Sequence, residues 1–281
     1  MEFARLIGAE PTFAINIEDN PTDVLALLKE IEPYGLQYIE IGNEECIGTT
    51  DANAYQHYID RYLLLHNALH TQYPDLKFIN AAWWRTDMPD LMRRVFEQLD
   101  GKCDYWDYHP WTETVAQAKA AEQELQQIRE LWMTWNPHTT MRVAILEENG
   151  NTHGMERALA HGQMLNAVLR MNDFVAMDSP ANALEPYKQN DNGWNQGQIF
   201  FTPSITYCQP PYYVQQIAAI NHQPLLVSSE CQDESVDITA CKNEAGDTLV
   251  VHVVNALSTK RNIRFNISGF GTIKAIKSYS V

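Results

Sequence analysis

Two stretches decide the fold: Tyr-Ile-Glu-Ile-Gly-Asn-Glu at residues 38–44 and Met-Arg-Val-Ala-Ile-Leu-Glu at residues 141–147. Each is a short apolar run that ends in a glutamate. Carboxylates are costly to bury beside apolar residues unless they are paired, hydrogen-bonded or shifted in pKa. Two strands that both end in this way predict a sheet whose carboxyl ends hold functional groups, here Glu44 and Glu147.

Short β-rich runs alternate with longer amphipathic runs over most of the chain. This alternation is typical of βα units and a parallel sheet, either doubly wound or closed into a barrel. No Gly-rich phosphate loop follows the strands, and polar residues follow them instead, which favours a (β/α)8 TIM barrel. Six strands fall short of that barrel, so we expect an α/β fold with a partial TIM barrel (strands 3 to 8), truncated at the N-terminus. The predicted strands are residues 12–17, 37–41, 77–81, 103–108, 141–146 and 174–177, and the predicted helices are 23–31, 54–71, 89–99, 115–135 and 157–171.

The pattern changes after about residue 221. Runs of period two, separated by turn residues, predict five strands of a small C-terminal β-sandwich. We therefore expect a partial TIM-barrel catalytic domain at residues 1–221 and a β-sandwich domain at residues 222–281. The predicted sandwich strands are residues 224–228, 235–242, 248–255, 262–267 and 273–279.

Composition argues against several classes of partner. The chain has 281 residues, 45% of them hydrophobic, which is enough for a large core. A net charge of -16 disfavours nucleic acid and anionic membrane surfaces, because both require clustered Lys and Arg. Five cysteines show no CxxC and no Cys/His metal spacing, so we expect no metal site. Neither a membrane-spanning run nor a signal-peptide layout is recognisable, which leaves the localisation open.

Glu44 and Glu147 suit the chemistry of a glycosidase. Retaining glycoside hydrolysis uses a nucleophilic carboxylate and an acid/base carboxylic acid roughly 5 Å apart, on opposite sides of the scissile bond. Adjacent parallel strands lie about 4.8 Å apart, so side chains from two strands can reach across one barrel mouth. The alternative for either glutamate alone is an ordinary strand-end residue that faces solvent.

Residues 38–45, Tyr-Ile-Glu-Ile-Gly-Asn-Glu-Glu, resemble the acid/base motif of clan A glycoside hydrolases, specifically of the family 51 α-L-arabinofuranosidases. The resemblance implies that Glu44 is the acid/base and that Asn43 binds the 2-hydroxyl of the sugar. The segment that ends in Asn16 resembles the family's third strand. Residues 107–111, Asp-Tyr-His-Pro-Trp, resemble its sixth strand, with Trp111 where a Tyr usually stands. His109 is then either an active-site hydrogen-bond donor or a structural histidine at a strand end.

The same resemblance places the nucleophile. Residues 146–149, Leu-Glu-Glu-Asn, followed by His153, are similar to the family's nucleophile segment, which implies that Glu147 attacks the sugar and that Asn149 lies beside it. Sliding the motif by one residue would assign Glu148 instead, but Asn149 and His153 would then lose their matches. Strand alternation also allows only one of the two glutamates to point into the barrel.

Further along, residues 194–197, Trp-Asn-Gln-Gly, resemble the loop after the family's eighth strand and make Trp194 and Gln196 candidates for binding sugar. The resemblance likewise makes Asn16, His109, Trp111 and Asn149 candidates for binding the substrate. Core packing is the alternative for the tryptophans, above all for Trp106, which lies within a strand. The charged stretch at residues 122–130 is most simply a solvated helix face, to which we assign no role.

The resemblance implies a retaining glycoside hydrolase that removes terminal α-L-arabinofuranosyl residues from arabinose-containing polysaccharides or oligosaccharides. Its partner is then a saccharide, and it requires no cofactor. Two alternatives stay open: another clan A retaining glycosidase, such as a xylosidase or endoglucanase, and a catalytically silent carbohydrate-binding fragment. Members of the family are often oligomers, so the resemblance implies that this protein forms a homo-oligomer. The residues themselves do not test this expectation.

Overall fold

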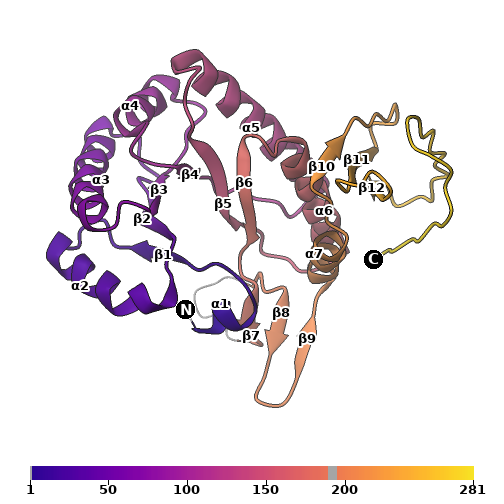
Figure 1. Cartoon of the computed structure of the whole chain (residues 1–281), viewed down its shortest axis with the longest axis horizontal. Helices are drawn as coiled ribbons and strands as arrows, with labels where there is room; N and C mark the ends of the chain where they lie inside the picture. The colour runs from indigo at the N-terminus through magenta and orange to yellow at the C-terminus, as the bar shows by residue number, and fades with distance from the viewer. Residues whose placement is uncertain (1, 189–194) are drawn as a thin grey trace. The chain divides into compact units, whose positions relative to one another are not determined.

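The computed structural model describes residues 2–188 and 195–281 (Figure 1). The chain forms two compact units. The first comprises Met1–Tyr108, Gln126–Ile145 and Asp173–Met177, and the second comprises His109–Leu125, Leu146–Asn172 and Asp178–Val281. Among the described residues, no helix is long and apolar enough to cross a membrane. The predicted domain boundary between residues 221 and 222 stays a prediction.

The six predicted strands form a sheet in which each strand neighbours the next one in the sequence. The pairs from β1 to β5 are parallel. A sheet that advances by one strand at a time has no topological switch point, so its order is that of a barrel and not of a doubly wound sheet. This confirms the partial TIM barrel. The strands are β1 Thr12–Ile15, β2 Tyr38–Glu45, β3 Lys77–Ala82, β4 Tyr105–Asp107, β5 Arg142–Glu148 and β6 Val175–Pro180.

Helices connect these strands, as parallel pairing requires. Asn20 and Asp51 cap the first two crossover helices, since their side chains accept hydrogen bonds from backbone N–H groups two residues further on. In Figure 1 the helices α2, α3 and α4 lie on one side of strands β1 to β4. The helices are α1 Glu2–Leu6, α2 Pro21–Ile31, α3 Ala52–Gln72, α4 Pro89–Leu99, α5 Val115–Trp135 and α6 Met155–Arg170, with a 3-10 turn η1 at Glu32–Tyr34.

Aromatic side chains fill the core of the first unit. Trp106 is 1% exposed, and its indole donates a hydrogen bond to the carbonyl oxygen of Ala82 at 2.8 Å. Its ring packs edge-on against Trp84 at 5.2 Å and lies 5.8 Å from Trp132. Trp106 is therefore a core residue, as its position within a strand indicated.

The second unit adds elements that the sequence pattern did not predict. Strands β7 Leu184–Pro186, β8 Ile199–Phe201 and β9 Thr206–Cys208 form a small sheet, and α7 Pro210–Ile220 follows it. Three-residue strands are too short to show period two, which is why the pattern missed them. Helix α6 packs on α7 and on the C-terminal sheet.

That C-terminal sheet has three antiparallel strands, β10 Leu225–Val227, β11 Val236–Lys242 and β12 Leu249–Asn255. They match three of the five strands predicted for this region. The other two predictions, residues 262–267 and 273–279, are wrong, because the described residues 256–281 contain no strand. Ile263, Phe265 and Ile267 alternate as a strand would but are 39–50% exposed. Alternation alone does not form a strand unless a neighbouring strand supplies backbone hydrogen bonds.

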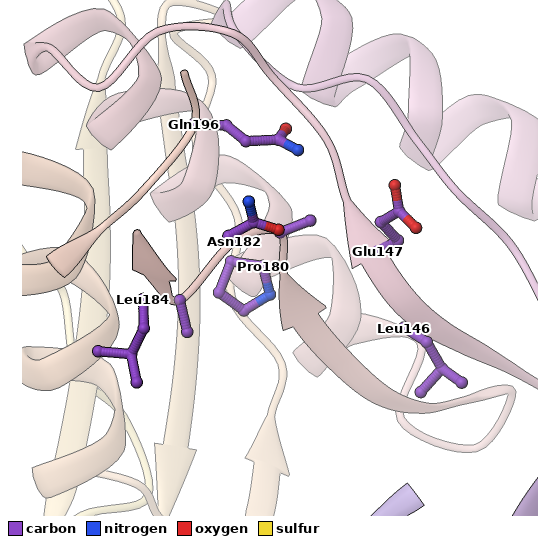
Figure 2. Close-up of a pocket in the computed structure, with 8 residues that line it drawn as sticks. Leu146, Glu147, Pro180, Asn182, Leu184 and Gln196 are labelled. Carbon is purple, nitrogen blue, oxygen red and sulfur yellow. The ribbon is translucent and has the colours of Figure 1, made fainter. Parts of the chain in front are cut away.

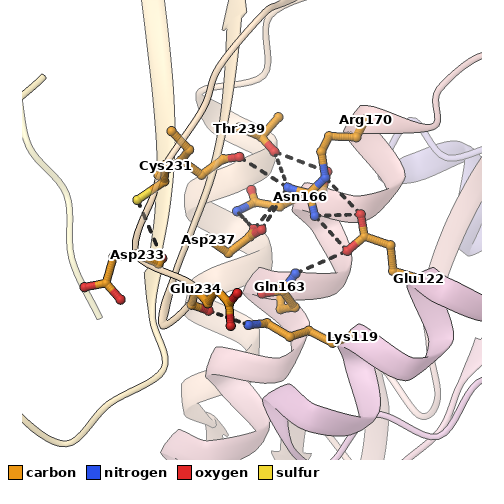
Figure 3. A network of polar contacts seen from close by, with 11 residues as sticks. Lys119, Glu122, Gln163, Asn166, Arg170, Cys231, Asp233, Glu234, Asp237 and Thr239 are labelled. Carbon is orange, nitrogen blue, oxygen red and sulfur yellow. Dashed lines mark hydrogen bonds and ion pairs between the residues drawn. The ribbon is translucent and has the colours of Figure 1, made fainter. Parts of the chain in front are cut away.

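A polar network joins this sheet to the helices beneath it (Figure 3). Arg170 of α6 forms ion pairs with Glu122 of α5 at 2.8 Å and with Asp237 of β11 at 3.0 Å. Asn166 donates a further hydrogen bond to Asp237 at 2.6 Å. Glu122 was expected on a solvated face without a role. That expectation is wrong for Glu122, because its side chain is 14% exposed and pairs with Arg170 of α6.

Candidate active site

In the first unit, the carboxyl end of β2 is bent. Gly42 has a φ of 101° and Glu44 a φ of 49°, and the register against β3 shifts between Ile41 and Glu45. A glutamate in the left-handed region costs of order 1–3 kcal/mol, and strain of this kind concentrates at functional sites. A bulge at a strand end also redirects the side chains that follow it. The bend leaves Asn43 exposed and Glu44 half-buried.

Gly42 is required by this bend. A Cβ atom at Gly42 would lie 2.4 Å from Cγ of Glu45, well inside contact distance. The carboxyl group of Glu45 is itself partly buried, and burial raises its pKa above the usual value. Gly42 thus makes room for Glu45, and the chain between them presents Asn43 and Glu44.

Two more carboxylates of the first unit lie below the bend, and sequence reasoning gave neither a role. Glu40 of β2 and Asp107 of β4 are 5% and 6% exposed, and an oxygen of one lies within 4.8 Å of an oxygen of the other. Their place in almost entirely apolar strands was the signal available in the sequence.

Asn16 lies directly after β1. It is exposed, and its side-chain oxygen accepts a hydrogen bond from the backbone N–H of Glu18 at 2.9 Å. This Asx turn ends the strand and uses one acceptor of the side chain.

In the second unit, Glu147 lies on the wall of a cavity of about 440 Å³. The volume is within the range of small-molecule sites. Figure 2 shows the Glu147 carboxylate and the amides of Asn182 and Gln196 around one space. The Glu147 side chain is 31% exposed, and its Oε2 lies 3.6 Å from Nδ1 of His109, whose side chain is 4% exposed. The remaining lining residues are Leu146, Pro180, Ala181, Ala183 and Leu184.

The neighbouring Glu148 points the other way and is fully buried. Its Oε1 accepts a hydrogen bond from the Thr112 hydroxyl at 2.7 Å, and its Oε2 lies 2.9 Å from Nδ1 of His161. The two glutamates therefore have opposite environments, as strand alternation predicts. Glu147 faces an open cavity, and Glu148 belongs to an internal polar cluster.

The remaining candidates of the second unit differ in placement. Gln196 is buried and lines the cavity, and its side-chain oxygen accepts from the N–H of Gly150 at 3.3 Å. Asn149 is buried and joined by a backbone bridge to Trp111, but neither residue lines the cavity. Trp111 is 38% exposed, and its indole donates to Glu113 at 3.0 Å. Trp194 lies outside the described residues.

Asn182 is a cavity residue that sequence reasoning missed. It follows β6 by two positions, and a polar residue just after a barrel strand was the available signal.

Two family models match the chain. The α-L-arabinofuranosidase 1 domain matches residues 26–130, and the α-L-arabinofuranosidase C-terminal domain matches residues 132–281. The chain is 26% identical over 251 residues to alpha-L-arabinofuranosidase 1 of Arabidopsis thaliana, covering 88% of this chain and 34% of the relative. It is 23% identical over 240 residues to probable alpha-L-arabinofuranosidase A of Aspergillus oryzae (strain ATCC 42149 / RIB 40), covering 85% and 35%. The chain thus spans about a third of the length of these curated relatives.

Solved structures agree on the fold. The family 51 arabinofuranosidase from Xanthomonas axonopodis pv. citri superposes with a TM-score of 0.71 at 12% identity, over 92% of this chain and 63% of that one. An arabinose-bound family 51 α-L-arabinofuranosidase gives 0.61 at 16% identity, over 86% and 37%. These similarities fit a partial TIM barrel with a C-terminal β domain. Because the C-terminal family model alone covers more than half of the sequence, the chain belongs to the α-L-arabinofuranosidases of glycoside hydrolase family 51.

Proposed function

We propose that this chain supplies the catalytic carboxylates of a retaining hydrolase that removes terminal α-L-arabinofuranosyl residues from arabinose-containing saccharides. The observation that carries the proposal is the contrast on β5. Glu147 lies on a cavity wall with the amide groups of Asn182 and Gln196, whereas Glu148 is buried in polar contacts. The names of the curated relatives, all α-L-arabinofuranosidases, support the choice of sugar.

In the first step, ionised Glu147 attacks the anomeric carbon while protonated Glu44 donates its proton to the glycosidic oxygen. The bond to the leaving alcohol breaks, and a glycosyl ester forms on Glu147. In the second step, Glu44 removes a proton from a water molecule, which hydrolyses the ester with overall retention of configuration. The reaction balances without a cofactor.

The other residues take supporting roles in this proposal. His109 lies close enough to Glu147 to orient its carboxylate. Gln196 and Asn182 supply amide donors and acceptors for sugar hydroxyls at the cavity wall. Asn43 and Asn16 are proposed to contact the sugar from the first unit, and Trp111 and Asn149 to shape the surroundings of the site.

The test is hydrolysis of 4-nitrophenyl α-L-arabinofuranoside by the parent chain and by Glu147→Gly, Glu44→Ala and Glu148→Gln. We expect Glu147→Gly to lose about 10⁴-fold or more in turnover, as nucleophile removal does elsewhere. Azide should restore part of it and give the inverted glycosyl azide, because azide attacks from the side the carboxylate has left. With Glu44→Ala, azide should give the retained product from the ester on Glu147.

Glu148→Gln is the matched control, and folded Glu148→Gln should keep most of its turnover. Loss confined to the Glu148 variant would overturn the assignment of Glu147. Preference for 4-nitrophenyl β-D-xyloside would indicate another retaining glycosidase of the same clan. Absence of turnover in the parent, together with no rise in its unfolding temperature when L-arabinose is added, would indicate a catalytically silent fragment.

A further inference from the structure

Arg157, in the first turn of α6, is a buried cation that the proposed chemistry does not use. It is 0% exposed, and all five of its N–H groups face acceptors. Nη1 donates to the carbonyl oxygens of Thr152 at 2.7 Å and Gln196 at 2.9 Å. Nη2 donates to the carbonyl oxygens of Ala181 at 2.9 Å and Glu148 at 3.5 Å. Nε donates to Nε2 of His161 at 3.1 Å.

The four carbonyl groups come from three segments of the chain, two of which line the cavity. Ala181, just after β6, and Gln196 are lining residues, and Glu148 is the chain neighbour of Glu147 on β5. Thr152 belongs to the connection from β5 to α6. One guanidinium group therefore ties the strand that holds Glu147 to two other segments of the cavity wall.

Gly150 supports this arrangement. A Cβ atom at Gly150 would lie 3.0 Å from Nε and 3.3 Å from Cζ of Arg157. The φ of Gly150 does not lie in the left-handed region, so the close approach of the guanidinium, together with Cγ of Glu113 at 3.0 Å, is what favours a glycine here. The backbone of residues 148–152 thus packs directly against Arg157.

His161 lies between Arg157 and Glu148 and contacts both. Because Arg157 only donates, Nε2 of His161 accepts and has no proton. The other ring nitrogen of His161, Nδ1, lies 2.9 Å from Oε2 of Glu148. Burial lowers the pKa of Arg157, and the charge of Glu148 opposes this shift. Burial and that same charge hold the pKa of Asp178 well above its usual value.

We propose that Arg157 is a positioning residue for Glu147: it holds the end of β5 against the two cavity segments at Ala181 and Gln196 and so fixes where the Glu147 carboxylate lies in the pocket. This rests on the proposed role of Glu147 as nucleophile. Misplacing a reacting group by about 1 Å costs roughly 100-fold in rate, so a clamp on the strand end affects turnover without touching the substrate.

The experiment compares the full chain with Arg157→Lys and Arg157→Ala, and uses Arg129→Ala as the control. Arg129 lies on α5, is 43% exposed and pairs with Asp173. Active sites are counted by stoichiometric labelling with an epoxide of α-L-arabinofuranose configuration, which esterifies the nucleophile, and kcat is expressed per labelled site. Amide hydrogen exchange is measured in parallel on the same proteins.

We expect kcat per labelled site to fall roughly 10- to 100-fold in both Arg157 variants, with less loss in Arg157→Lys and KM within about threefold of the parent. Amides of residues 148–150, 181–184 and 196–199 should exchange faster, while those of β2 and α3 should not change. A kcat per labelled site equal to that of the parent would overturn the positioning role. Any loss of total activity would then come from a smaller number of folded molecules. Equal acceleration of exchange everywhere would overturn it too.

If the parent neither hydrolyses the substrate nor accepts the label, the proposed function fails and hydrogen exchange alone decides about Arg157. Faster exchange confined to the three segments would then establish the clamp, and unchanged or uniformly faster exchange would refute it.

Discussion

Replacing Glu148 should destabilise the protein far more than replacing Glu147, although the two are adjacent and identical in type. Glu148→Ala removes the buried carboxylate next to His161 and takes away the negative charge that faces Arg157. Breaking a buried ionic cluster by removing one partner costs about 3–5 kcal/mol. Glu147→Ala removes a side chain that is 31% exposed, with its nearest ionic partner at 3.6 Å. Such a change costs at most about 1 kcal/mol.

Two features of the structure place the Glu148 value near the lower end. The Thr112 hydroxyl keeps a second acceptor, the carbonyl oxygen of Asn149 at 3.4 Å. Glu113 and Glu185 also raise the pKa of Arg157, so the guanidinium keeps two further negative charges nearby when Glu148 is lost. About 3 kcal/mol corresponds to a drop of roughly 6–12 °C in unfolding temperature for a chain of this size.

The assay is thermal unfolding at pH 7, followed by far-ultraviolet circular dichroism, for the parent, Glu147→Ala and Glu148→Ala. Urea unfolding at 25 °C gives the same comparison as a free energy, provided the m-value does not change. Unfolding temperatures within about 2 °C of each other would refute the reasoning, and so would a Glu147 variant that is the less stable of the two.

Three further predictions concern other parts of the chain. Asp178→Asn should change the pH dependence of stability. The raised pKa of Asp178 means that the folded state binds more protons than the unfolded state above about pH 4, so the parent loses stability as pH rises and the variant does not. Urea unfolding at pH 4 and pH 8 checks this, and an equal change in the free energy of unfolding of both proteins would contradict it. Gly42→Ala should cost about 1–3 kcal/mol because of its positive φ and the contact that a Cβ would make, more than Gly48→Ala, which has open space around it; thermal unfolding of both variants decides. Arg170→Ala should cost about 2–3 kcal/mol and expose residues 222–281 to limited proteolysis, whereas the more exposed Arg129→Ala should cost at most about 1 kcal/mol; equal protease resistance would count against the network in Figure 3.

The sequence predicted those features that depend on local pattern. Apolar runs marked all six barrel strands, and polar residues after them marked Glu44 and Glu147. Period two marked β11 and β12 but also suggested two later strands that are absent among the described residues, because alternation does not reveal whether a neighbouring strand exists. The roles proposed for Glu44 and Glu147 came from a family motif and remain to be tested.

Arg157 and Asp178 show what pattern cannot reveal. Nothing nearby in the sequence marks Arg157 as buried, since its acceptors are backbone carbonyls from residues up to 39 positions away. Among the residues that the structure describes, Asp178 has no hydrogen-bond partner for either buried oxygen, a property that only the folded chain has. Both belong to contacts between segments that are distant in the sequence, which single-residue propensities do not encode.

The guanidinium of Arg157 donates four hydrogen bonds to backbone carbonyl oxygens and one to a side chain, that of His161. Every non-proline residue presents the same carbonyl oxygen, so Thr152, Ala181 and Gln196 can be exchanged for other residues without removing a hydrogen bond to Arg157. The side chains that line the cavity at positions 181 and 196 are therefore independent of the backbone hydrogen bonds that hold these segments to Arg157. Under the proposed function, substitutions at positions 181 and 196 are expected to alter which sugar fits while β5 stays in place, which makes these positions starting points for directed evolution of a new substrate preference.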